Sequence, residues 1–132
     1  MVVHVATADL KRYERGNMVL SEFEIKRIQK VVGEYIEKHR PPAHIRNELD
    51  LSFRIEGQSV LILEIRPSWQ NPKEKLESEV AKATFVKIKK TWKIYWMRAD
   101  LKWHRYDPDP EVKSIEDFVE VVERDEYGCF FG

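Results

Sequence analysis

Residues 49–67 and 81–106 contain short runs of the kind found in β-strands, separated by turn signals and by one polar segment. Every second residue of 49–55 is apolar, which predicts a strand with one solvent-facing side. Gly57 in the turn "EGQ" supplies the positive φ that such turns often need, and residues 59–67 then predict a more deeply buried strand. The aromatic and β-branched residues of 81–98 predict two further strands or one bent strand. Consecutive strands joined by short turns pair antiparallel, which narrows the choice of fold considerably.

Two amphipathic helices flank the predicted sheet. Ser21 and Glu24 have the spacing of a capping box, and apolar residues recur after them at helical spacing. The prolines of "RPP" at 40–42 end this helix because proline cannot continue it. Ser114 and Asp117 repeat an N-cap pattern before a second apolar stripe. The sequence therefore predicts an α+β domain, with an antiparallel sheet of about four or five strands and an N-terminal and a C-terminal helix packed on it.

Two less regular segments complete this prediction. Residues 68–79 are polar and predict a connector with one helical turn after Pro72. The tail "YGCFFG" is apolar to the last residue, so we expect it to be tied into the sheet or the core.

The composition is typical of one globular domain, with 132 residues of which 42% are hydrophobic and 35% charged. We assign residues 1–20 to an N-terminal extension and residues 21–132 to a single domain. No uncharged apolar run approaches the roughly 20 residues of a membrane span, and the first residues do not resemble a secretory signal. The single cysteine, Cys129, is typical of a reducing compartment. We therefore expect a cytoplasmic protein without membrane contact.

The net charge of zero conceals a strong segregation of charge along the chain. Residues 80–106 carry eight Lys or Arg against Asp100 alone, whereas residues 107–132 carry nine Asp or Glu against Lys113 and Arg124. Either the acidic C-terminal helix docks beside the basic strands and the two fields cancel, or the two regions lie apart and leave a basic face exposed. The sequence leaves both interpretations open.

The stretch "WKIYWMRADLKWHRY" (92–106) holds three of the four tryptophans. As one straight strand it would change its apolar face midway, which the strand period does not allow, so a turn at 98–101 is required. With a loop of two or four residues, Trp96 lies opposite Trp103. We therefore predict a hairpin in which both tryptophans face the core and an amphipathic stripe faces away.

Three segments, "LILEIRPSW", "AKATFVKIKKTWKIYWMRADLKWHRYDPDP" and "DEYGCFFG", resemble the small bacterial proteins grouped as domain of unknown function 3024. The similarity extends from about Ser21 to the C terminus. It implies a bacterial, single-domain, cytoplasmic protein and implies no activity. The family pattern places polar residues at Glu64, Arg66, Lys82, Arg98, Asp100, Lys102 and His104.

Lysines interleave with aromatic residues in the basic segment. Cations for phosphates and rings for bases are what proteins use to bind single strands on a sheet. The residues that we assign to such binding are Lys87, Lys89, Lys93, Tyr95, Arg98, Lys102 and His104. In the alternative interpretation the tryptophans are core residues and the lysines are solvated edge residues that discourage edge-to-edge pairing.

A polar cluster near Glu64 has the residue types of a metal-dependent phosphodiesterase. The spacing Asp50…Glu64-x-Arg66 is similar to the Asp…Glu-x-Lys pattern of restriction-enzyme-like nucleases, with arginine in place of lysine. The residues that would carry catalysis are Glu64, Arg66, Lys82, Asp100, Lys102 and His104. The alternative is an ion-pair network that fixes strand register and joins Glu64, Arg66, Arg98 and Asp100.

Other chemistry has little support in the sequence. His39 and His44 have no matching Cys or His pair, so we predict no metal site, and without a Gly-rich phosphate loop we expect no cofactor. A protein partner or a second copy of the chain could use the sheet edge, Trp69 or the apolar tail. We predict a non-catalytic binding module for protein or nucleic acid and leave open whether the chain is an enzyme. The alternative is a metal-dependent nuclease-like enzyme centred on Glu64.

Overall fold

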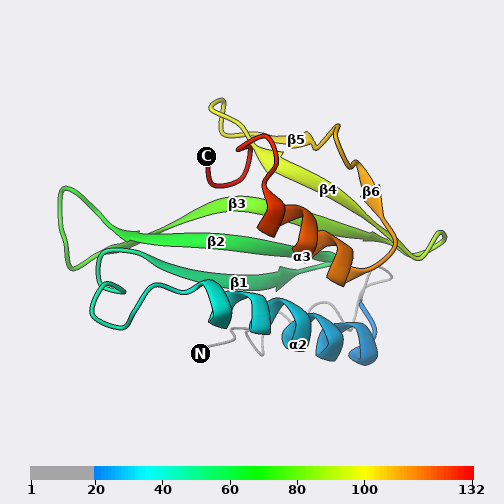
Figure 1. Cartoon of the computed structure of the whole chain (residues 1–132), viewed down its shortest axis with the longest axis horizontal. Coiled ribbons are helices and arrows are strands. Elements are labelled where there is room, and N and C mark those ends of the chain that lie inside the picture. The colour runs from blue at the N-terminus through cyan, green and yellow to red at the C-terminus, as the bar shows by residue number, and fades with distance from the viewer. Residues whose placement is uncertain (1–19) are drawn as a thin grey trace.

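A computed structural model describes residues 20–132 of the chain (Figure 1). The predicted N-terminal extension lies outside the described residues except for Leu20, which is buried. In chain order the elements are α2 (Glu22–His39), β1 (Asp50–Glu56), β2 (Ser59–Pro67), β3 (Lys75–Val86), β4 (Thr91–Met97), β5 (Trp103–Arg105), β6 (Glu111–Val112) and α3 (Ile115–Arg124). Within the described part of the chain, no helix is long and apolar enough to cross a membrane.

The strands form one antiparallel sheet in the order β1-β2-β3-β4-β5, and the short β6 pairs with β4. Both helices contribute to the hydrophobic core on one face of this sheet (Figure 1). Side chains from both helices and from the strands are fully buried there, including Ile28, Ile36, Phe53, Ile62, Ile94 and Phe118. The predicted α+β fold is therefore confirmed, and the opposite face of the sheet carries polar and aromatic side chains together with the buried Leu61 and Leu63.

The helix boundaries follow from local capping. The Ser21 hydroxyl accepts a hydrogen bond from the Glu24 N–H at 3.1 Å, and the Ser114 hydroxyl accepts one from the Asp117 N–H at 3.1 Å. Each bond satisfies an amide that has no partner within its own helix. Helix α2 ends at His39, directly before Arg40 and the two prolines, as predicted.

The C-terminal tail is tied to the core through one residue that follows α3. Asp125 adopts a left-handed conformation with φ 37°. Its carboxylate accepts hydrogen bonds from the N–H groups of Phe130 and Phe131 at 3.1 and 2.9 Å. Phe130 is buried against Tyr106, with ring centroids 4.8 Å apart. The predicted attachment of the tail is confirmed.

Strand β3 begins earlier than the sequence predicts. It starts at Lys75, inside the segment that we assign to a polar connector, and a hydrogen-bonded turn at 71–74 replaces the predicted helical turn. Residues 75–78 are exposed, so they carry no apolar alternation that would mark them as a strand. They pair with the end of β2, and this part of the hairpin extends beyond the helices (Figure 1).

The β4–β5 hairpin forms, but its register differs from the prediction by one residue. Met97 lies opposite Trp103 and Trp96 opposite His104, so the predicted Trp96–Trp103 pair is wrong. The cause is Leu101, whose φ of 60° adds one left-handed residue to the turn. Because side chains alternate between the two faces, this extra residue places Trp103 on the open face of the sheet instead of the core face.

The turn holds Leu101 in a conformation that costs a leucine about 1–2 kcal/mol. Its N–H donates to the Arg98 carbonyl at 2.9 Å, and the side chain is 82% exposed and offers little burial in return. We expect Leu101→Gly to raise the free energy of unfolding by about 0.5–1 kcal/mol, after the entropy that glycine loses on folding is subtracted. Urea unfolding measures the change. Ala99→Gly, in the same turn at a negative φ, should lower stability instead; a gain at both positions would contradict the explanation.

Candidate nucleic-acid interface

A row of side chains crosses the open face of the sheet. Strand register places Arg54 beside Leu61, Leu61 beside Lys82, Lys82 beside Tyr95 and Tyr95 beside Arg105. Ala81 and Ala83 on either side of Lys82 point into the core, so Lys82 must point away from it. The row therefore presents two cations and an aromatic ring over β3, β4 and β5.

Lys82 lies between two aromatic rings on this face. Its Nζ is 4.8 Å from the ring centroid of Tyr95 and 4.8 Å from that of Trp103. Both distances are within the range of cation–π attraction. Burial lowers the pKa of Lys82, and the carboxylates of Glu79 and Glu56 oppose this effect. Tyr95 and Trp103 remain partly exposed, so the three side chains form a surface cluster and not a core contact.

Further cations continue from this cluster toward the β3–β4 turn. Lys93 is exposed on β4 and, two residues from Tyr95, lies on the same face. The turn at 87–90 carries Lys87, Lys89 and Lys90, all exposed. Within residues 20–132, the only ion pair of these four lysines is that of Lys89 with Glu111, at 3.9 Å. The predicted binding residues on this side are therefore accessible to an anionic ligand.

The acidic helix α3 does not neutralise these lysines. Glu116 pairs with Arg27, and Glu123 lies 3.4 Å from Lys38 and 3.5 Å from His39, all on α2. Helix α3 thus docks on the sheet, as one interpretation of the charge pattern requires, but two of its carboxylates pair with α2 and Glu120 pairs with Arg124 of α3 itself. The open face of the sheet keeps its positive charge.

An acidic cluster limits the basic surface on its other side. Arg54 donates to Glu56 at 2.7 Å, to Glu77 at 2.9 Å and to Glu79 at 2.9 Å. These carboxylates outnumber the arginine, so the part of the face over β1 and the start of β3 is unfavourable for a polyanion. The basic region is therefore confined to β3, β4, β5 and the β3–β4 turn.

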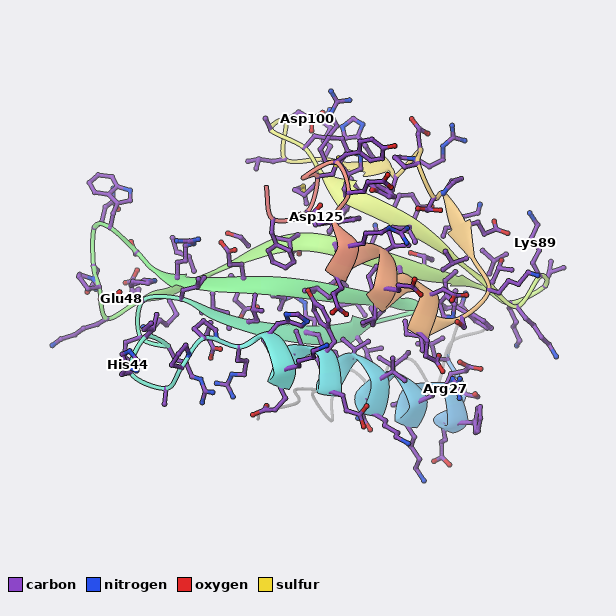
Figure 2. All side chains as sticks on the ribbon, in the orientation of Figure 1. Arg27, His44, Glu48, Lys89, Asp100 and Asp125 are labelled. Atoms are coloured by element: carbon purple, nitrogen blue, oxygen red, sulfur yellow. The ribbon has the colours of Figure 1, made fainter. Side chains whose placement is uncertain are left out.

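Three predicted binding residues, Arg98, Lys102 and His104, lie in the β4–β5 turn or in β5, away from the lysines of the β3–β4 turn. Figure 2 shows Asp100 in this turn and Lys89 in the turn at the other end of β4. The Asp100 carboxylate lies 2.8 Å from His104 Nε2, and this hydrogen bond is the main reason that the pKa of Asp100 is lowered. Arg98 lies over the ring of Trp96, 5.4 Å from its centroid, and Lys102 is exposed. Arg98, Lys102 and His104 therefore form a group of predicted binding residues separate from Lys87, Lys89 and Lys93.

The residues of the predicted nuclease site are not brought together. Glu64 accepts a hydrogen bond from Arg66 at 2.7 Å, and Asp50 is held by two bonds from Arg40. Lys82 belongs to the open face, and Asp100 to the β4–β5 turn. Residues 20–132 contain no group of three His, Cys, Asp or Glu side chains that could hold a metal ion.

The whole described region matches one known protein family. The sequence model of a family described as domain of unknown function (DUF3024) matches residues 20–132. The chain belongs to this family. No curated protein and no solved structure matches it.

The sequence patterns miss two residues of the open face in this DUF3024 chain. They assign Trp103 to the core and give Arg105 no role in any site, whereas both lie on the open face. Both positions depend on the register of β5, which in turn depends on the left-handed Leu101. A leucine carries no signal for a positive φ, whereas a glycine or asparagine would have indicated the extra residue.

Proposed function

We propose that this DUF3024 domain is a non-catalytic module that binds single-stranded nucleic acid on the open face of β3, β4 and β5. The observation that carries the proposal is the position of Trp103 beside Tyr95, with the ammonium group of Lys82 between their rings. Stacking of bases on aromatic rings beside a cation is the way that proteins bind single strands without reading sequence.

The shape of the surface favours a single strand over a duplex. A sheet face with partly exposed rings offers stacking, which needs unpaired bases, whereas duplex reading needs an element that enters a groove. The cations that would contact phosphates lie around the rings, with Arg105 in the same row, Lys93 two residues along β4 and Lys87 in the turn beyond. A strand that crosses β4 toward this turn would meet rings first and then lysines.

Trp103→Ala and Tyr95→Ala are each expected to weaken binding of a fluorescent single-stranded oligonucleotide roughly tenfold, because each removes a stacking platform. Fluorescence anisotropy at several salt concentrations measures the affinity. If Lys82, Lys93 and Arg105 each contact one phosphate, the logarithm of the affinity should fall with the logarithm of salt with a slope of roughly −2.

Trp69→Ala is the matched control, since Trp69 is 87% exposed in the β2–β3 connection and lies outside the proposed face. It should leave the affinity unchanged. An affinity that does not change with salt concentration, or that falls equally in the Trp69 and Trp103 variants, would contradict the proposal. If no oligonucleotide binds, nucleic-acid binding is excluded and a protein partner is the remaining prediction. The exposed Trp69 is its main support.

The proposed setting is the cytoplasm of a bacterium. The single cysteine, Cys129, is free, and burial raises the pKa of its thiol, so it is a poor nucleophile or ligand as the thiol. Such a cysteine is in keeping with a reducing compartment. A protein partner and a homodimer both remain predictions.

A further inference from the structure

A cavity of about 620 Å³ lies on the helix side of the sheet, where the N-terminal ends of α2 and α3 meet the β3–β4 turn. Its size is within the range of pockets that bind small molecules. Leu20, Trp92 and Ile115 are buried and supply the apolar interior. In Figure 2, Arg27 and Lys89 mark this end of the molecule.

Two phenylalanines line the cavity with different exposure. Phe85 packs on Trp92 with ring centroids 5.0 Å apart and is only partly buried. Phe23, on the first turn of α2, is 69% exposed. A large apolar side chain at the first turn of a helix, beside a cavity that it lines, offers a surface on which a flat ring could stack.

The rim of the cavity carries an excess of positive charge. Lys87, Lys90 and Lys113 line it, and within residues 20–132 none of the three has an ion pair. Arg27 also lines it and is paired with Glu116. Among the described residues, Glu24 carries the only carboxylate that lines the cavity, so the cations prevail and an anion is favoured.

We propose that this cavity binds a small molecule made of a flat aromatic ring and a phosphate. The phosphate would lie at the three lysines and the ring between Phe23 and Phe85. Charged hydrogen bonds to the phosphate would supply specificity, and burial of the ring on the apolar interior would supply affinity. The aromatic part of the site is separate from the strand-binding face, because Phe85 and Trp92 contribute to the core side of the sheet, whereas Lys87 of the β3–β4 turn is common to both sites.

The proposal is tested by titrating the full chain with adenosine monophosphate and with phenyl phosphate. Calorimetry and amide NMR shifts measure the binding. Both should bind and shift the amides of Phe23, Lys90 and Ile115. Adenosine, which lacks the charge, and inorganic phosphate, which lacks the ring, should each bind at least roughly tenfold more weakly. Binding of both aromatic phosphates identifies an aryl phosphate site, and binding of adenosine monophosphate alone identifies a nucleotide site.

Lys90→Gln combined with Lys113→Gln should weaken adenosine monophosphate roughly tenfold, because two charged contacts are lost. Both residues are exposed, so the fold should persist. Phe23→Ala should weaken the nucleotide but not inorganic phosphate. Lys30→Gln with Lys73→Gln neutralises two exposed lysines outside the cavity and is the matched control.

Four results would overturn this proposal. They are the absence of binding up to about 10 mM, adenosine binding as tightly as its monophosphate, equal weakening in the control double variant, and amide shifts confined to Tyr95 and Trp103. Tyr95→Ala with Trp103→Ala should leave nucleotide affinity intact. A loss of oligonucleotide binding in that variant with retained nucleotide binding would therefore separate the two sites experimentally.

Discussion

Phe118→Ala is expected to lower the free energy of unfolding by about 3–5 kcal/mol. Phe118 lies in the middle of α3 and is fully buried in the core between the helices and the sheet. Truncation removes the apolar surface that the ring buries and leaves a cavity that the neighbouring side chains fill only in part. Since a domain of this size has a total stability of about 5–15 kcal/mol, the variant should be close to unfolding at physiological temperature.

Urea unfolding at 25 °C measures the loss, and an unchanged m-value would show that the native state stays compact. Phe23→Ala is the matched control, because it removes the same atoms from a side chain that is 69% exposed. Its effect should stay within about 0.5 kcal/mol. A loss below about 1.5 kcal/mol for Phe118→Ala would mean that α3 contributes little to the core, and the assignment of both helices to one packed layer would be wrong.

The parts of the fold that the sequence predicts well are those decided by neighbours along the chain. Ser21 and Ser114 cap helices through amides three residues away. Gly57 has the positive φ, 58°, that a tight turn between β1 and β2 requires. Such interactions involve few residues, so one short pattern is enough to indicate them.

The parts that the sequence mispredicts lack a local signal. The first residues of β3 are exposed on both faces and are strand only because β2 pairs with them. The register of β5 depends on Leu101, a residue type that seldom adopts a positive φ. Both errors come from tertiary structure that overrides a local preference, and the second one moves Trp103 from the core to the open face.

The two proposed sites differ in how far each can be predicted from the sequence. The open-face cluster comes from strands that are neighbours in the chain, so Lys93 and Tyr95 are found once a sheet is predicted. The cavity joins the start of α2, the β3–β4 turn and the start of α3, which are far apart in the chain. No spacing rule links Phe23 to Lys113, and only the packing of the two helices brings them together.

Asp50→Asn is expected to lower the free energy of unfolding by about 2–3 kcal/mol at pH 7. Asp50 begins β1 and accepts two hydrogen bonds from Arg40, which follows α2, both at 2.8 Å. The side chains of Arg40 and Asp50 are only 12% and 19% exposed, so the loss leaves a largely buried arginine with only the more distant Glu37, at 3.9 Å, as a counter-charge. The Leu51 N–H also donates to Asp50, at 2.8 Å. The expected loss is set below that of a fully buried pair, because water still reaches both groups.

The same contact predicts how this difference depends on pH. Hydrogen bonding to Arg40 is the main reason that the pKa of Asp50 lies below its ordinary value of 3.8. A lowered folded-state pKa means that the carboxylate stabilises the fold fully above the ordinary value and that this stabilisation is lost as the pH falls through the folded-state pKa. The stabilities of the native chain and of Asp50→Asn should therefore converge below about pH 4.

Urea unfolding of both proteins between pH 2 and pH 7 tests this convergence. Asp107→Asn is the matched control, because the side chains of Asp107 and its partner Arg105 are 74% and 72% exposed and form a pair at 2.7 Å. An exposed pair contributes at most about 1 kcal/mol, so this variant should differ little from the native chain at any pH. A constant deficit for Asp50→Asn from pH 7 to pH 2 would show that the loss comes from altered packing and not from the charge. In that case Arg40 and Asp50 would hold the end of α2 against β1 through shape alone.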